Sequence, residues 1–175
     1  KARDVPELIE QHFARKQPLE RLLYQDNESG QRIPLEHDIQ FFAKQQAVAL
    51  RNRGRTDPED IRDAIRRGAY RGIRKLLREQ TSPDTIVEEV TRSGLRGRGG
   101  GGFPTGIKWQ SCRRASLAQG VDPFLVCNGD EGDPGAFMDR ALLEGVPHQV
   151  IEGMIIAAYA VGASKGFVYV RAEYP

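Results

Sequence analysis

The apolar positions in the middle of the chain recur at the three- and four-residue spacing of amphipathic helices. Two helix starts are marked by an acidic or hydroxyl residue followed by proline, at Asp57-Pro58 and Ser82-Pro83. Gly68 interrupts the first of these patterns, which then resumes. This part of the chain is therefore predicted to form successive short helices, each with one apolar face.

The preceding residues carry a weaker pattern. Val5 to Lys16 has apolar residues at helical spacing and is expected to form a short helix, and Gln25 to Gln31 is a polar loop. Ile39 to Arg53 is close to helical periodicity, and a strand near Ala47 to Leu50 is the alternative for its second half. We expect residues 1–56 to form a helical extension or linker and residues 57–175 to form the main domain.

The last third of the chain predicts an α/β arrangement. Phe124 to Cys127 is a short apolar run typical of a buried strand, and Phe167 to Arg171 is a second strand-like run. Between them, Pro147 opens a helix that ends near Gly162 and is apolar on nearly all sides, which indicates burial. A β–loop–α–β unit of this kind places its two strands parallel.

The segment from Ser93 to Trp109 reads SGLRGRGGGGFPTGIKW, and seven of its residues are glycine. Glycine exposes backbone N–H groups without a Cβ, and Arg96, Arg98 and Lys108 supply fixed positive charge. This combination predicts a loop that holds an anion.

Two standard nucleotide-binding motifs are excluded. The GxGxxG pattern at Gly97, Gly99 and Gly102 follows a helix, whereas the dinucleotide fingerprint follows a strand. The P-loop pattern fails because Ile107 separates the last glycine from Lys108 and no Ser or Thr follows.

A plain flexible linker is the simplest alternative for this segment, but linkers rarely contain bulky residues such as Phe103, Pro104 and Trp109. An aromatic side chain beside open backbone suits a flat ring system, on which Phe103 would stack. Lys108 offers a charge to a phosphate or to a developing anion.

The first strand is followed by NGDEGDPGAFMDR, a turn-rich acidic segment. Ligands in parallel sheets bind beyond the carboxyl ends of the strands, which is where Asn128 to Glu131 would lie. The carboxylates of this acidic segment lack the EF-hand spacing, so we expect no metal site there. A solvated turn is the structural alternative. His148, at a helix start, is expected to be structural rather than catalytic.

Composition limits the remaining classes. A net charge of +2 gives no global reason to expect nucleic-acid binding, and the basic run from Arg51 to Arg78 is typical of solvated helix faces. Cys112 and Cys127 have no metal-ligand spacing and are expected to be reduced thiols in a cytoplasmic protein. No apolar run has the length of a membrane span.

Four motifs, in order, carry a resemblance to a known family: SGLRGRGGGGFPTGIKW, NGDEGDPGAFMDR, PHQVIEGM and YVRAEYP. They resemble the 51 kDa-type FMN- and NADH-binding subunit of respiratory complex I. The resemblance extends to the diaphorase subunits of soluble NAD(P)-linked hydrogenases, formate dehydrogenases and electron-bifurcating enzymes. It covers residues 57–175.

The resemblance implies an oxidoreductase subunit in which hydride passes between NAD(P)H and non-covalent FMN, and electrons pass on to iron–sulfur partner subunits. Phe103 and Glu131 correspond to residues that meet the nicotinamide nucleotide, and Glu131 is the candidate catalytic residue. The cofactor-binding residues that the resemblance implies are Gly97, Arg98, Gly99, Gly100, Phe103, Lys108, Asn128, Asp130 and Glu131.

Within the family, GDPGAFMDR is more similar to the hydrogenase and formate-dehydrogenase branch. A later Gly-Glu-Glu flavin contact and a Cys-x-x-Cys-x-x-Cys cluster site do not occur in the chain, so iron–sulfur ligands are expected elsewhere. We therefore expect an incomplete FMN-binding domain, which by itself binds FMN weakly or not at all.

Two alternatives remain open. RGRGGGG beside arginine-coated helices is compatible with an RGG-like nucleic-acid-binding module, although such tracts normally repeat and are disordered. A structural pseudo-subunit that keeps the fold without the chemistry is the other.

Overall fold

The computed structural model describes residues 1–133 and 135–173. The chain divides into two compact units, Lys1–Ala47 and Val48–Pro175. The expected boundary after residue 56 remains a prediction.

The first unit contains short elements only. A helical segment comprises α1 (Val5–Glu7) and a wider π-helical stretch, Leu8–Ala14, in the region predicted to be helical. The polar loop connects the strands of a hairpin, β1 (Tyr24–Gln25) and β2 (Arg32–Ile33). One further helical turn, α2, covers Gln40–Ala43. Single 3-10 turns lie at Ala2–Asp4, Glu20–Leu22 and Glu36–Asp38.

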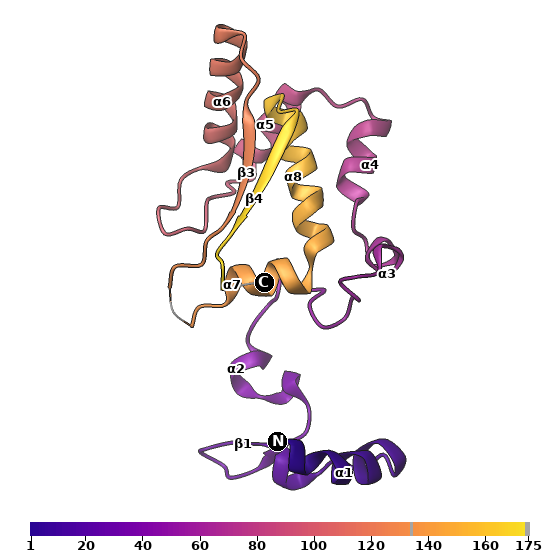
Figure 1. Ribbon diagram of the computed structural model, residues 1–175. Helices are drawn as coiled ribbons and strands as arrows, with labels where there is room; N and C mark the ends of the chain where they lie inside the picture. Colours follow the sequence, from indigo (N-terminus) through magenta and orange to yellow (C-terminus); the bar gives the residue numbers. More distant parts are fainter. Residues whose placement is uncertain (134, 174–175) are drawn as a thin grey trace. The chain divides into compact units, whose positions relative to one another are not determined.

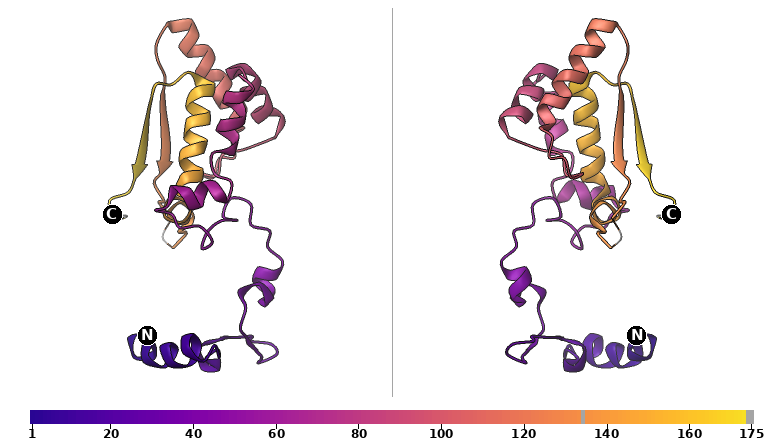
Figure 2. Two further views of the ribbon diagram at one scale, coloured as in Figure 1. Left: turned by 90° about the vertical axis from the view of Figure 1, so that its right-hand side faces the viewer. Right: turned by 90° about the vertical axis from the view of Figure 1, so that its left-hand side faces the viewer.

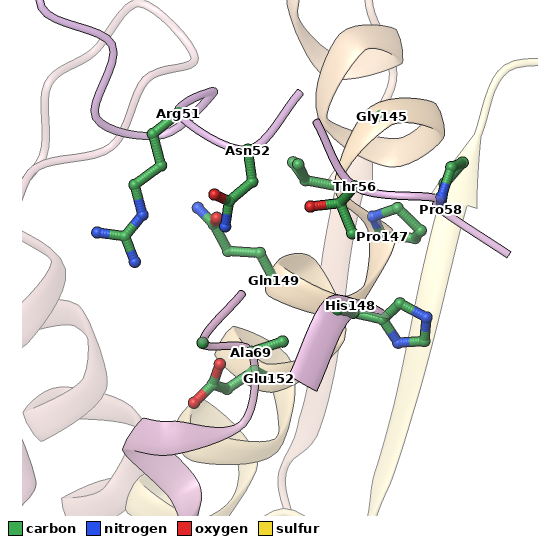
Figure 3. Close-up of a pocket in the computed structure, with 13 residues that line it drawn as sticks. Arg51, Asn52, Thr56, Pro58, Ala69, Gly145, Pro147, His148, Gln149 and Glu152 are labelled. Carbon is green, nitrogen blue, oxygen red and sulfur yellow. The ribbon is translucent and has the colours of Figure 1, made fainter. Parts of the chain in front are cut away.

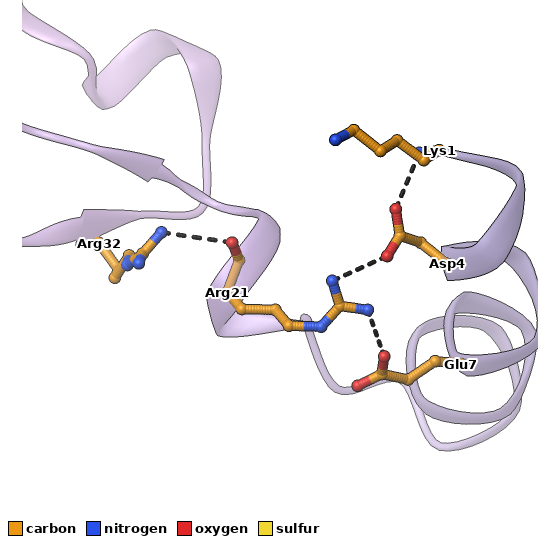
Figure 4. Close-up of polar contacts among 5 residues, drawn as sticks. All are labelled: Lys1, Asp4, Glu7, Arg21 and Arg32. Carbon is orange, nitrogen blue, oxygen red and sulfur yellow. Dashed lines mark hydrogen bonds and ion pairs between the residues drawn. The ribbon is translucent and has the colours of Figure 1, made fainter.

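A buried carboxylate links the helical segment of the first unit to the residues before its hairpin (Figure 4). Asp4 is 4% exposed and accepts a hydrogen bond of 2.8 Å from Arg21 Nη1. The same guanidinium contacts Glu7, and the amino group of Lys1 lies 2.8 Å from Asp4 Oδ2. The backbone amino group of Lys1 lowers the pKa of Asp4 most, and Arg21 lowers it further.

The second unit contains six helices and a two-stranded sheet within its described residues. Their bounds are α3 (Ile61–Arg66), α4 (Arg71–Arg78), α5 (Pro83–Arg92), α6 (Thr105–Gln119), β3 (Phe124–Gly129), α7 (Met138–Gly145), α8 (Pro147–Val161) and β4 (Lys165–Val170). The predicted α/β arrangement is confirmed.

Local signals explain several of these helix ends. Ser82 caps α5 by accepting the Thr85 N–H at 3.1 Å, as its sequence predicts. Helix α3 begins later than Asp57-Pro58 indicates, because Asp60 is the residue that caps it, accepting the Arg62 N–H at 2.8 Å. Gly162 ends α8 in the left-handed conformation.

Strands β3 and β4 are parallel, as the crossover rule predicts, with Val126 opposite Phe167. The crossover consists of the acidic loop, α7 and α8 (Figure 1). Helix α8 lies between the sheet and α4, with contacts to both strands and to that helix (Figure 1).

The core forms where α5, α6 and α8 meet (Figure 2). Its buried members are Ile86, Val87 and Ala160, and Leu76 and Trp109 pack against them. The helix that begins at Ser82-Pro83 therefore buries one apolar face, as its residue spacing predicts.

The prediction that the first strand is buried is wrong. One face of the sheet packs on α8, but Phe124 and Val126 on the other face are 62% and 58% exposed. Helix α8 is also less enclosed than its composition indicates, since Ile151 and Ile155 are each 43% exposed. Among the described residues, none of the helices combines the length and the apolar character that crossing a membrane requires.

Candidate functional site

The glycine-rich segment is a closed hairpin loop between α5 and α6. The N–H of Gly97 donates to the carbonyl of Phe103 at 2.9 Å, and that of Thr105 donates to the carbonyl of Leu95 at 2.9 Å. An isolated bridge pairs Arg96 with Pro104 between them. The base of the loop is thus hydrogen-bonded, unlike a flexible linker or a disordered RGG tract.

The tip of this hairpin needs glycine for its backbone geometry. Gly100 and Gly102 have φ of +98° and +57°, a region that residues with a Cβ rarely adopt. Nothing lies within 4 Å of where a Cβ would be at Gly99 or Gly100, so one side of the tip is open. Arg96 and Arg98 are both exposed, and Arg96 Nη1 donates to the Gly102 carbonyl at 3.0 Å.

Lys108 lies in the first turn of α6 and its side chain is exposed. The N-cap residue, Pro104, provides no side-chain hydrogen bond to this helix start. The positive end of the helix dipole and the lysine charge therefore favour the same kind of ligand, one with negative charge. Phe103 is 57% exposed beside them.

A close helix crossing holds the end of the hairpin where α6 begins. Gly106 is buried against Thr91 of α5, and a Cβ at position 106 would lie 2.6 Å from the Thr91 Cα. Only glycine permits this approach. The crossing therefore determines where α6 starts relative to α5, and with it where the hairpin lies.

The acidic loop begins with a turn made by its own side chains. Asn128, near the end of β3, accepts the N–H of Asp130 through Oδ1 at 2.9 Å. Such Asx turns reverse the chain directly after a strand. The carboxylate of Asp130 is left exposed.

Glu131 is used differently from Asp130. It is 5% exposed, and its carboxylate accepts the backbone N–H groups of Met138, Asp139 and Arg140, the last two at 3.2 Å. These are the donors at the start of α7 that have no partner within the helix. Arg171, after β4, donates to the Glu131 carbonyl. Glu131 thus connects the acidic loop, α7 and the end of the second strand.

Two ionisable groups near this carboxylate have shifted pKa values. Burial, and then the charge of Glu131, raise the pKa of Asp139. Burial, and then Asp139, raise the pKa of the Cys127 thiol. Cys127 is therefore a protonated thiol at neutral pH, with low nucleophilicity.

Strands β3 and β4 run toward the end of the second unit at which α6 begins (Figure 1). The glycine hairpin precedes α6 and the acidic loop follows β3, so both loops lie toward that end. Among the described residues, Lys108, Asn128 and Asp130 make no hydrogen bonds to one another. The structure thus gives two separate surfaces toward which a ligand could extend.

A pocket that the sequence did not reveal lies where α8 begins, among residues that include Thr56, Gln149 and Glu152 (Figure 3). Glu152 accepts the N–H groups of Tyr70 and Gly72 at 2.6 and 2.7 Å and so caps α4 from another helix. The only sequence signal for this contact is the lack of a capping residue at the start of α4.

His148 lines the same pocket and pairs with Tyr70, with 2.8 Å between Nδ1 and the hydroxyl oxygen. Burial raises the pKa of Tyr70, and the charge of Glu152 raises it further. This contact agrees with the structural role predicted for His148. In the described part of the chain, the buried Thr56 hydroxyl has no hydrogen-bond partner.

Residues 1–133 and 135–173 contain no group of three or more His, Cys, Asp or Glu side chains that could hold a metal ion. The two loops offer open backbone, fixed cations, exposed acids and the exposed aromatic rings of Phe103 and Phe137.

Comparison with known proteins gives a consistent set of relatives. Residues 90–175 match the family described as the Nuo51 FMN-binding domain. The chain is 54% identical over 133 residues to the NADP-reducing hydrogenase subunit HndC of Solidesulfovibrio fructosivorans, which is 75% of this chain and 26% of that protein. It is 46% identical over 122 residues to the alpha subunit of the NAD-reducing hydrogenase HoxS of Cupriavidus necator, covering 70% of this chain and 18% of that subunit.

Subunits of NADH-quinone oxidoreductases are also similar to the chain. A subunit of the NADH-quinone oxidoreductase of Rhizobium meliloti is 54% identical over 107 residues, with coverage of 61% of this chain and 24% of that protein. A chain from the crystal structure of an NAD+-reducing NiFe hydrogenase in its H2-reduced state aligns with a TM-score of 0.53 and 34% identity, covering 99% of this chain and 26% of that one. The chain spans about a quarter of the length of HndC and of the Rhizobium protein.

Proposed function

The chain belongs to the family of 51 kDa-type FMN-binding subunits found in complex I and in NAD(P)-linked hydrogenases, and on this basis we propose that it supplies one wall of a flavin site. The proposed activity is NAD(P)H:acceptor oxidoreduction, a diaphorase reaction, within a multi-subunit enzyme. The observation that carries the proposal is the hydrogen-bonded glycine hairpin with its open tip and adjacent Lys108.

The residues at the hairpin fit such a group. A Cβ at Gly99 or Gly100 would project into open space, so these positions give a flat ring access to the backbone. Lys108 compensates negative charge on the bound flavin, and Phe103 is exposed for stacking against a nucleotide ring. When bound, FMN supplies the hydride chemistry, while the protein contributes orientation and electrostatics.

The acidic loop forms a second part of the proposed site. Asn128 and Asp130 present an amide and a carboxylate beyond the end of β3. For Glu131 we propose positioning rather than direct contact with the nicotinamide, because its carboxylate already accepts three backbone N–H groups. The remaining proposed cofactor contacts are Gly97 and Arg98.

The other parts of the proposal concern the whole enzyme. Iron–sulfur subunits receive or supply the electrons, and the location is cytoplasmic.

The direct test uses the full-length subunit in its native complex. We expect flavin absorbance, FMN as the extracted flavin, and NADH- or NADPH-dependent reduction of a dye. A complex that lacks flavin but binds RNA in a salt-dependent manner would support the nucleic-acid-binding module instead. A complex with neither property would support the pseudo-subunit.

Titration of FMN against the 175-residue chain tests the expectation that it forms only part of the site. We expect weak binding or none. Stoichiometric flavin that stays bound through purification of this chain would contradict that expectation.

A further inference from the structure

Helix α4 carries four cationic side chains at the spacing of a single helix face. Arg71, Arg74, Lys75 and Arg78 occupy positions i, i+3, i+4 and i+7, and all four are exposed. Together with Glu79 they border one shallow surface depression. With a rise of about 1.5 Å per residue, the four charges extend along roughly 10 Å of helix.

These cations are not neutralised within the described part of the chain. None of the four forms an ion pair there, whereas Arg67 pairs with Asp63 at 3.0 Å and Arg113 pairs with Asp84 at 2.8 Å. Like charges four residues apart repel each other and weaken a helix. The chain thus concentrates unpaired charge on a short helix at a cost to local stability.

Other contacts keep α4 folded despite this repulsion. Glu152 of α8 accepts N–H groups at the start of the helix, and its negative charge lies at the positive end of the helix dipole. On the opposite face, Leu76 packs against the core cluster of Ile86, Val87 and Ala160. The fold therefore requires the apolar face and the cap, and it does not require the four cations.

We propose that the basic face of α4, defined as Arg71, Arg74, Lys75 and Arg78, docks an acidic surface of a partner protein. Leu77, which is 65% exposed, flanks this face three residues after Arg74 and does not border the depression. Charge complementarity accelerates and orients such docking. The proposal goes beyond the flavin site and rests on the proposed function only in placing the chain within a multi-subunit complex.

The same observations favour a protein over nucleic acid or membrane. Surfaces that bind single-stranded nucleic acid combine cations with aromatic side chains, and α4, with the sequence RGIRKLLR, contains no aromatic residue. A membrane-surface helix needs a free apolar face, but in α4 that face is packed toward α8 and the core.

The first test measures binding of the 175-residue chain to labelled poly-L-glutamate by fluorescence anisotropy at low and at physiological salt. Replacing all four cations by glutamine (R71Q/R74Q/K75Q/R78Q) is expected to weaken binding at least tenfold. It should not lower the unfolding temperature, because it removes repulsion. The matched control R55Q/R62Q/R92Q/R114Q removes the same charge from exposed, dispersed positions and should weaken binding less than threefold.

Equal losses in the two quadruple variants would overturn the proposal, because binding would then follow net charge. Tighter binding of polyuridylate RNA or of phosphatidylglycerol vesicles than of poly-L-glutamate at physiological salt would also overturn it, in favour of those surfaces.

The second test uses the purified native complex and a zero-length carbodiimide cross-linker, which joins a lysine amine directly to a carboxylate. We expect Lys75 to be recovered cross-linked to Asp or Glu of another subunit, and this product to disappear in Lys75→Arg, which keeps the charge. The proposal would be contradicted if Lys75 were readily acetylated in the intact complex and formed no such cross-link. Flavin content of the same preparation reports on the proposed function separately, because cross-linking of Lys75 does not depend on flavin.

Discussion

Gly106 of α6 lies directly against Thr91 of α5, so close that a Cβ at position 106 would be 2.1 Å from Thr91 Oγ1 and 2.6 Å from both its Cα and its nitrogen. Two of these neighbours are backbone atoms, which cannot rotate away. The contact brings together two helices that are separated in sequence only by the glycine hairpin. Its geometry therefore determines how the proposed cofactor loop is held.

We expect Gly106→Ala to force α5 and α6 apart, lowering the free energy of unfolding by about 2 kcal/mol, the usual cost of overpacking. Flavin affinity of the full complex should fall with it, because the hairpin moves. Chemical denaturation and flavin content measure the two effects. The matched control is Gly153→Ala on α8, where nothing lies within 4 Å of the new Cβ and alanine favours the helix. If Gly106→Ala behaved like this control, the close crossing would not exist in solution.

Glu131→Ala should destabilise the second unit, because three N–H groups at the start of α7 lose their acceptor. From the range for lost helix caps we expect about 2 kcal/mol. Asp133→Ala, an exposed position in the same loop, is the control and should change stability little. Urea denaturation provides the measurement.

The conservative variant Glu131→Gln separates positioning from catalysis. A positioning role predicts lower flavin affinity and lower stability together, with turnover per bound flavin largely retained. Loss of turnover at unchanged stability and flavin content would instead support the catalytic role considered from the sequence.

Lys108→Ala should lower flavin occupancy of the full complex. A hydrogen bond to a charged group contributes about 1.5–3 kcal/mol, so the dissociation constant should rise by roughly tenfold or more. Lys108→Arg should retain part of the affinity that Lys108→Ala loses. The control is Lys165→Ala at the start of β4, far from the carboxyl end of the strand, which should leave flavin occupancy unchanged. Unchanged occupancy in Lys108→Ala would place the role of this lysine elsewhere.

Asp139→Asn should stabilise the protein at neutral pH. Burial and the charge of Glu131 raise the pKa of Asp139, so the folded state binds this proton more tightly than the unfolded state does. The stability of the wild type therefore decreases as pH rises from about 4 toward the native pKa, and the asparagine variant lacks this decrease. Thermal unfolding from pH 3 to pH 8 should show the two curves separating with rising pH. Asp133→Asn controls for removal of an exposed charge, and curves that stay parallel would refute the assignment.

Local sequence signals predicted much of the second unit. The apolar face of α5 with its Ser82 cap and the parallel strands β3 and β4 are confirmed. These features depend on side-chain periodicity, capping and chain connectivity, all of which act over short distances in sequence. By contrast, α6 and α7 were not predicted, because α6 has no clear apolar face and α7 begins within a segment whose turn residues dominate its pattern.

Residue type and spacing alone predict a glycine-rich, cationic segment and an acidic turn that accompany a parallel β–loop–α–β unit. The role of each of these residues depends on the folded chain. The tertiary structure closes the glycine segment into a hairpin, assigns the Glu131 carboxylate to the start of α7, and leaves the basic face of α4 without partners among the described residues. Such roles depend on contacts between residues that are far apart in sequence, such as the hydrogen bond from the Gly72 N–H to Glu152. Local sequence patterns do not encode such contacts.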